Sequence, residues 1–90
     1  MEDTKDIAQE QNENLSSLKE KFPEAMNNFM SFMKEVEKDG SLDSKTKELI
    51  AISLAVKAQC HWCIALHVKK LLGLGATREE ILESAMMAVV

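Results

Sequence analysis

The sequence predicts a small all-α protein. Apolar residues recur at spacings of three and four in successive segments, which is the pattern of helices with one buried face. No segment alternates apolar and polar residues as a strand does, and no glycine-rich phosphate loop follows a strand-like segment. A chain of 90 residues allows one small domain, and its 46% hydrophobic composition is typical of a sequence that folds.

The first part of the chain is polar, and we expect residues 1–21 to form a solvated helix or arm. Pro23 suits the first turn of a following helix, and Gly40 suits the position after its end. Between them, one helical face is apolar and consists of Met26, Phe29, Met30, Met33 and Val36. We interpret this face as core packing. The helical domain is therefore expected to span residues 22–90.

Two further helices follow. Asp43 or Ser44 can cap the first of them, whose apolar face is wide. The second covers about residues 60–72, and the glycines of segment 73–75 end it. Since short connections join these segments, we expect antiparallel packing.

A last helix begins at Thr77, because Thr77 and Glu80 have the spacing of a capping box. Its end, residues 85–90, is apolar on every side. We expect this end to pack against a neighbouring subunit or to continue into further residues. A chain this short buries a limited share of its surface, which also favours a homo-oligomer.

Charge and hydropathy exclude several classes of partner. The net charge is −4, and no basic patch could neutralise a run of phosphates, so nucleic acid is not expected as a partner. No stretch approaches the roughly 18 apolar residues of a membrane span. The N-terminus lacks the basic and apolar regions of a secretory signal, so the expected location is the cytoplasm. A reducing compartment disfavours a permanent structural disulfide between the two cysteines.

The residues most suited to chemistry are Cys60, Cys63 and His67. On a helix, Cys63 lies about 60° around the axis from Cys60, and His67 falls between them. Cys63 and His67 are four residues apart, close enough for an imidazole to exchange a proton with a thiol. We expect Cys60 in the first turn, where the helix dipole favours a thiolate. One cysteine can then attack and the other resolve the product.

Two other interpretations of these residues stay open. The cysteines and the histidine could be buried core residues without chemistry. They could also bind zinc. A zinc ion takes about four ligands, and three of them would then have to come from one helix. The thioredoxin interpretation fails, because that motif belongs to a βαβ unit and no strand is expected here.

Three blocks of the sequence together resemble the alkylhydroperoxidase D / carboxymuconolactone decarboxylase family. They are GSLDSKTKELI at 40–50, Cys60-x-x-Cys63-x-x-x-His67, and GATREEI at 75–81. The resemblance covers roughly residues 22–90. It implies an all-helical subunit, homo-oligomers that are often trimers or hexamers, and a redox-active cysteine pair served by a glutamate and a histidine.

The resemblance assigns four catalytic residues: Cys60, Cys63, His67 and Glu48, the last standing twelve positions before the first cysteine. It implies that the glutamate, with histidine and water, helps to deprotonate the second cysteine, which activates the first. Twelve residues of straight helix would hold Glu48 about 18 Å from Cys60. The chain must therefore bend near residues 58–60, or Glu48 must act on a neighbouring subunit.

We therefore expect an enzyme that reduces a small peroxide or a disulfide, with Cys60 as nucleophile, Cys63 as resolving cysteine, and no organic cofactor or metal. Electrons would come from a thiol reductant that the sequence does not identify. One alternative is a non-enzymatic oligomeric module that uses the cysteines for zinc binding or redox sensing. Another is a lactone decarboxylase, a reaction with no evident need for a dithiol.

Overall fold

The computed structural model describes residues 4–90, with side chains from residue 9 onward. This part of the chain contains five α-helices and no strand, which confirms the predicted all-α class. The helices are α1 (Thr4–Lys21), α2 (Pro23–Glu37), α3 (Ser44–Lys57), α4 (His61–Gly73) and α5 (Arg78–Met86).

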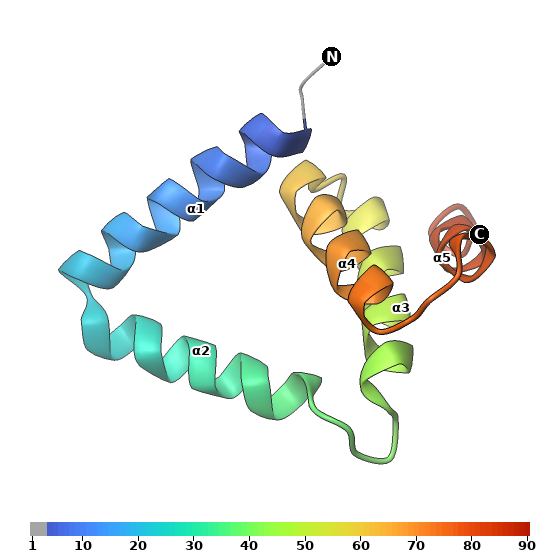
Figure 1. Ribbon diagram of the computed structural model, residues 1–90, viewed down its shortest axis with the longest axis horizontal. Helices are drawn as coiled ribbons and strands as arrows, with labels where there is room; N and C mark the ends of the chain where they lie inside the picture. Colours follow the sequence, from blue (N-terminus) through green and yellow to red (C-terminus); the bar gives the residue numbers. More distant parts are fainter. Residues whose placement is uncertain (1–3) are drawn as a thin grey trace.

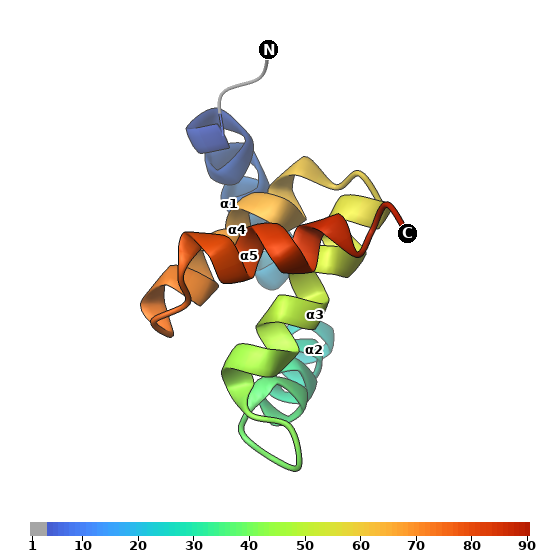
Figure 2. The ribbon, with the colours of Figure 1, turned by 90° about the vertical axis from the view of Figure 1, so that its right-hand side faces the viewer.

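The helices form two groups (Figure 1). Helices α3 and α4 run antiparallel and pack on each other, and α5 runs across α3 (Figure 2). Helices α1 and α2 form a V-shaped pair, which meets the first group where α1 contacts α4 and where α2 ends beside α3. The radius of gyration is 14.1 Å, whereas a compact domain of this length has about 12 Å. The V-shaped α1–α2 pair therefore extends away from a three-helix core.

The core lies between α3, α4 and the start of α5. Ile52 and Leu71 are 1% and 0% exposed, and Ala76 is buried beside them. Partly buried side chains surround this centre, namely Leu49, Ile64, Val68 and Ile81. Each fully buried Leu or Ile contributes about 1.5–3 kcal/mol, so this small cluster holds α3 and α4 in place.

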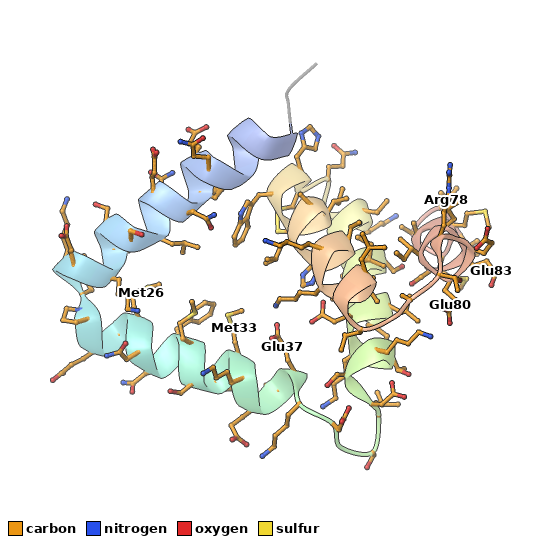
Figure 3. The ribbon with its side chains drawn as sticks, in the orientation of Figure 1. Met26, Met33, Glu37, Arg78, Glu80 and Glu83 are labelled. Carbon is orange, nitrogen blue, oxygen red and sulfur yellow. A yellow bond between two sulfur atoms is a disulfide. The ribbon has the colours of Figure 1, made fainter. Side chains whose placement is uncertain are left out.

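The predicted core role of the apolar face of α2 is wrong for the single subunit, because α2 has no buried residue. Phe29, Met30 and Val36 are each about half exposed, at 52%, 44% and 51%. Met26 and Met33 are partly buried and lie on the side of α2 that faces α1 and α4 (Figure 3). Helical spacing identified the residues that share a face, but the polar helix α1 offers little apolar surface to cover them.

Two predicted helix caps are confirmed. The Asp43 carboxylate accepts a hydrogen bond from the amide of Thr46 at 2.7 Å, which caps α3. Thr77 and Glu80 form the reciprocal capping box at the start of α5. Helix α5 ends at Met86, earlier than the apolar pattern suggested, and a turn follows it.

Side chains of α3 attach the end of α2 to the core. The Lys47 ammonium donates to the carbonyl oxygens of Val36 and Lys38, both at 2.7 Å. The Ser44 hydroxyl donates to the carbonyl of Glu37 at 2.9 Å. These bonds satisfy carbonyls that a helix C-terminus leaves without intrahelical partners. They also fix Glu37 close to α3 and α4.

Candidate active site

A tight turn between α3 and α4 reverses the chain just before the cysteine motif. The amide of Cys60 donates to the carbonyl of Ala55, and the amide of Gln59 donates to that of Val56, both at 3.1 Å. This pair of bonds is a Schellman motif, which requires a left-handed residue after the helix. Gln59 takes that role with φ 56°. The bend near residues 58–60 that the sequence requires is therefore present.

Cys60 is the N-cap of α4. The sequence predicts instead a position within the first turn of the helix, one residue further on. Its backbone is extended because the same residue completes the Schellman turn of α3. The Sγ atom of Cys60 accepts a hydrogen bond from the amide of Cys63 at 3.2 Å. This position still favours a thiolate, since unpaired amides and the helix dipole point at the sulfur.

Cys60 and Cys63 form a disulfide in the structure. Their Cα atoms are 5.2 Å apart, within the usual range for bonded cysteines. Both residues are partly buried. The start of α4 thus places the two predicted redox cysteines at bonding distance.

Glu48 and His67 meet across the interface between α3 and α4. Oε2 of Glu48 lies 2.6 Å from Nδ1 of His67, and both residues belong to one subunit. Glu48 is 4% exposed. An ionised carboxylate can only accept a hydrogen bond, so opposite such a carboxylate Nδ1 is the donor, and in a neutral imidazole Nε2 is then the acceptor. Cys63 lies one turn before His67 on the same helix.

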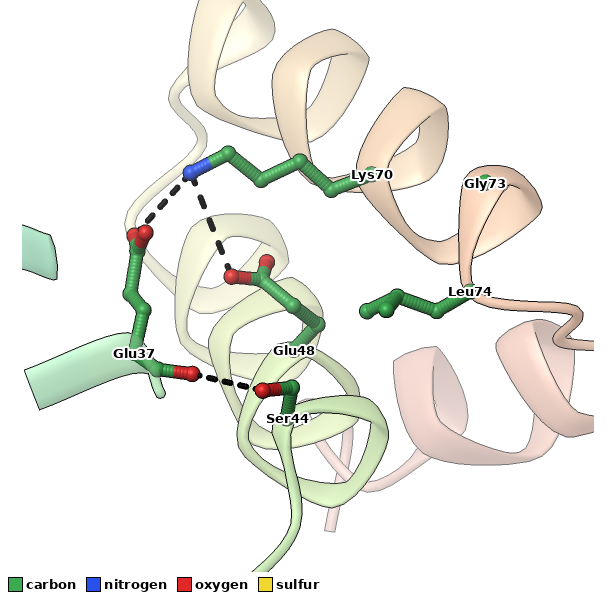
Figure 4. Close-up of a pocket in the computed structure, with 6 residues that line it drawn as sticks. All are labelled: Glu37, Ser44, Glu48, Lys70, Gly73 and Leu74. Carbon is green, nitrogen blue, oxygen red and sulfur yellow. Dashed lines mark hydrogen bonds and ion pairs between the residues drawn. The ribbon is translucent and has the colours of Figure 1, made fainter. Parts of the chain in front are cut away.

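Sequence reasoning missed two charged residues beside this pair, Lys70 and Glu37. Nζ of Lys70 lies 3.0 Å from Oε1 of Glu37 and 3.9 Å from Oε1 of Glu48 (Figure 4). Lys70 could have been suspected, because it follows His67 by three positions on the same helix. Glu37 had no comparable local pattern.

These charged groups line an open hollow in the surface. Its volume is about 310 Å³, and its lining residues are Glu37, Ser44, Glu48, Lys70, Gly73 and Leu74. Water in this hollow reaches Lys70 and Glu37, whose side chains are 30% and 34% exposed. The Glu48 carboxylate therefore borders solvent on the Lys70 side while it remains almost fully buried.

Two further properties concern residues 4–90 as a whole. Among the side chains that the structure describes, from residue 9 onward, no group of three or more His, Cys, Asp or Glu is arranged to hold a metal ion. Within residues 4–90, no helix combines the length and the apolar character needed to cross a membrane.

Solved structures of similar proteins share this fold. A carboxymuconolactone decarboxylase family protein from Legionella pneumophila is 45% identical and superposes with a TM-score of 0.91. The alignment covers 96% of this chain and 77% of the Legionella chain. A protein from Methanobacterium thermoautotrophicum is 31% identical with a TM-score of 0.73, over 78% of this chain and 79% of that one.

Two further proteins are similar to this chain in sequence. "Uncharacterized protein 4 in cox locus" of Paracoccus denitrificans is 47% identical over 60 residues, which is 67% of this chain and 54% of that protein. The chain thus matches about half the length of this relative. An uncharacterized protein of Cupriavidus necator is 40% identical over 81 residues, 90% of this chain and 72% of its own length.

A sequence model of one protein family matches the part of the chain that contains the whole candidate site. A model of the carboxymuconolactone decarboxylase family matches residues 23–90, which include helices α2 to α5. The matched part contains the cysteine pair and the Glu48–His67 hydrogen bond. The chain belongs to the carboxymuconolactone decarboxylase family.

Proposed function

We propose that this protein is a thiol–disulfide oxidoreductase with peroxidase-type activity. The observation that carries the proposal is the hydrogen bond between buried Glu48 and His67, one helical turn from a cysteine pair at disulfide distance. A carboxylate that orients a histidine toward a nucleophile is a recurring arrangement in catalysis by side chains. A purely structural disulfide needs no such base.

The proposed cycle begins with proton transfer. Nε2 of His67 takes the proton of the Cys63 thiol, and the Cys63 thiolate takes the proton of the Cys60 thiol. The Cys60 thiolate then attacks the O–O bond of a hydroperoxide, which gives a sulfenic acid on Cys60 and releases an alcohol. His67 returns its proton to the leaving oxygen.

The second half of the cycle forms the disulfide. Cys63, deprotonated again by His67, attacks the Cys60 sulfur, and the sulfenic oxygen leaves as water with the proton from His67. Two thiols and one hydroperoxide thus give one disulfide, one alcohol and one water. An external dithiol then reduces the disulfide by exchange. A disulfide substrate would enter the same cycle through a mixed disulfide with Cys60.

The assignment of Cys60 as nucleophile rests on its cap position. Its sulfur accepts the amide of Cys63 and lies at the positive end of the α4 dipole, which stabilises a negative charge on sulfur. Cys63 lies inside the helix, one turn before His67, and suits the resolving role. The cycle needs no organic cofactor, and a cytoplasm with its thiol reductants would return the disulfide to dithiol.

We also propose that the protein acts as a homo-oligomer, with a trimer or hexamer as the expected form. Large apolar side chains remain exposed along the single chain, among them Phe22, Phe29, Phe32, Leu54, Leu82, Met86 and Met87. Apolar surface of this extent is typical of a protein that associates. Light scattering coupled to size exclusion gives the number of subunits directly.

The function is tested by intact mass under denaturing conditions. Reduced protein is measured before and after one equivalent of hydrogen peroxide, and then after a dithiol. We expect a loss of two hydrogens that the dithiol restores, and no such loss in Cys60→Ser or Cys63→Ser. An unchanged mass, or one raised only by added oxygen, would overturn the proposal.

Turnover separates an enzyme from a redox sensor or a zinc-binding module. A trace of protein with excess dithiol should consume many equivalents of peroxide. A redox sensor or a zinc-binding module would raise the consumption of peroxide little above that of the dithiol alone. A structural role for the cysteines would instead disrupt assembly in Cys60→Ser, whereas the proposed chemistry leaves the oligomer intact.

A further inference from the structure

A lysine and a second glutamate extend the Glu48–His67 pair into a chain of four charged groups. His67 contacts Oε2 of Glu48, and the Lys70 ammonium lies 3.9 Å from Oε1 of the same carboxylate. Lys70 also pairs with Glu37 at 3.0 Å. The groups come from three helices, with Glu37 on α2, Glu48 on α3, and His67 and Lys70 on α4.

The burial of Glu48 explains what Lys70 can do. A carboxylate that is 4% exposed is costly to keep ionised without positive partners. Among the described residues, His67 and Lys70 are the positively charged or protonatable partners of Glu48. His67 must be neutral before it can accept a proton from Cys63. In that state Lys70 supplies the positive charge.

The negative charge of Glu37 opposes the effect of Lys70 on the Glu48 carboxylate. The Glu37 carboxylate holds the Lys70 ammonium at 3.0 Å, and the Glu37 backbone is fixed by Ser44. The nearby Lys47 ammonium donates its hydrogen bonds to the carbonyls of Val36 and Lys38 and not to Glu37 or Glu48. When His67 carries a proton, two cations and two carboxylates balance. The positive charge of Lys70 therefore disfavours a proton on the Glu48–His67 pair, and the negative charge of Glu37 favours one.

We propose that Lys70 is a positioning residue that keeps Glu48 anionic and His67 able to accept the thiol proton, and that Glu37 moderates it. This inference rests on the proposed dithiol cycle and adds to it a residue that acts through Glu48. It predicts an effect on the pH dependence of the cycle rather than on its maximal rate.

The test measures the rate of disulfide formation in the reduced protein, at fixed hydrogen peroxide, between about pH 5 and 9. Trp62 is the one tryptophan in the sequence and stands inside the cysteine motif, so its fluorescence reports this step. Lys70→Met removes the cation and keeps most of the side chain. We expect the pH of half-maximal rate to rise by about half a unit or more, with a similar plateau at high pH.

Three further variants sharpen the result. Lys70→Arg keeps the charge and should restore the wild-type profile. Glu37→Gln removes the opposing charge, so its half-maximal pH should fall by a smaller amount. Lys69→Met is the matched control, because Lys69 is the exposed neighbour on the same helix and should not move the profile.

The outcomes separate this inference from the proposed function. A Lys70→Met protein that cycles with an unmoved half-maximal pH, or with rates lowered equally at every pH, overturns the role of Lys70 alone. If that variant does not fold, Glu37→Gln decides, and an unmoved or raised half-maximal pH overturns the inference. A wild-type protein that forms no disulfide overturns the proposed function and this inference together.

Discussion

Nδ1 of His67 and Oε2 of Glu48 lie 2.6 Å apart although 19 positions separate the two residues in the chain. The contact exists because the turn at Gln59 and Cys60 folds α4 back along α3. The buried carboxylate thereby reaches the histidine of its own subunit, and no second chain is needed to complete this hydrogen bond.

Glu48→Gln should slow disulfide formation by roughly 10- to 100-fold at neutral pH, because the neutral amide no longer supports a proton on His67. The measurement is the second-order rate constant for oxidation of the reduced protein by hydrogen peroxide. Glu35→Gln is the control, since Glu35 lies exposed on α2 beside Lys38. Equal rates for Glu48→Gln and the wild type would remove Glu48 from the mechanism.

Local patterns in the sequence were enough to predict the helices, the caps at Asp43 and Thr77, and the shared location of the cysteines. Each of these depends on residues within about one or two helical turns, so spacing alone indicates it. The position of the bend was inferred from a functional demand on Glu48. Its form was not foreseen, because a glutamine occupies the left-handed position that glycine usually takes.

Contacts between distant segments could not be predicted in the same way. Glu37 and Lys70 are 33 positions apart and meet because the end of α2 is tied to α3. The apolar face of α2 shows the converse problem. Its spacing indicates a buried surface, but what covers Phe29 and Met30 depends on tertiary or quaternary packing that a periodic pattern does not contain.

Leu71→Ala should lower the free energy of unfolding by about 2–5 kcal/mol, because Leu71 is 0% exposed and its loss leaves a cavity beside Ile52. Leu72→Ala is the matched control. Leu72 is the next residue on α4 and is 60% exposed, so its loss should cost no more than about 0.5 kcal/mol. Urea unfolding measures both. Similar losses for the two variants would contradict the assigned core.

Acid should destabilise the protein partly through Glu80. A hydrogen bond from Lys45, followed by one from the Thr77 amide, lowers the pKa of Glu80 below its ordinary value. A group whose pKa is lower when folded stabilises the fold above its unfolded pKa, and this contribution disappears as the pH falls through the folded pKa. The loss therefore occurs below about pH 4.5.

Glu80→Gln should accordingly lose less thermal stability than the wild type between neutral pH and about pH 3. Asp43 is expected to act likewise, because hydrogen bonds from Thr46 lower its pKa. Melting temperatures at a series of pH values measure the effect. Glu83→Gln, on the same helix but outside the capping box, serves as control and should follow the wild type. Parallel curves for Glu80→Gln and the wild type would contradict the assignment.

Gln59→Gly should stabilise the reduced protein by about 1 kcal/mol, because Gln59 has φ 56° and a side chain in that region is strained. Gly75, with φ 80°, occupies the equivalent position after α4 and is the internal comparison. Gly75→Ala should therefore destabilise by a similar amount, about 1 kcal/mol. Urea unfolding of both variants decides. If Gln59→Gly were no more stable than the wild type, contacts of the Gln59 side chain would have to offset the strain in front of Cys60.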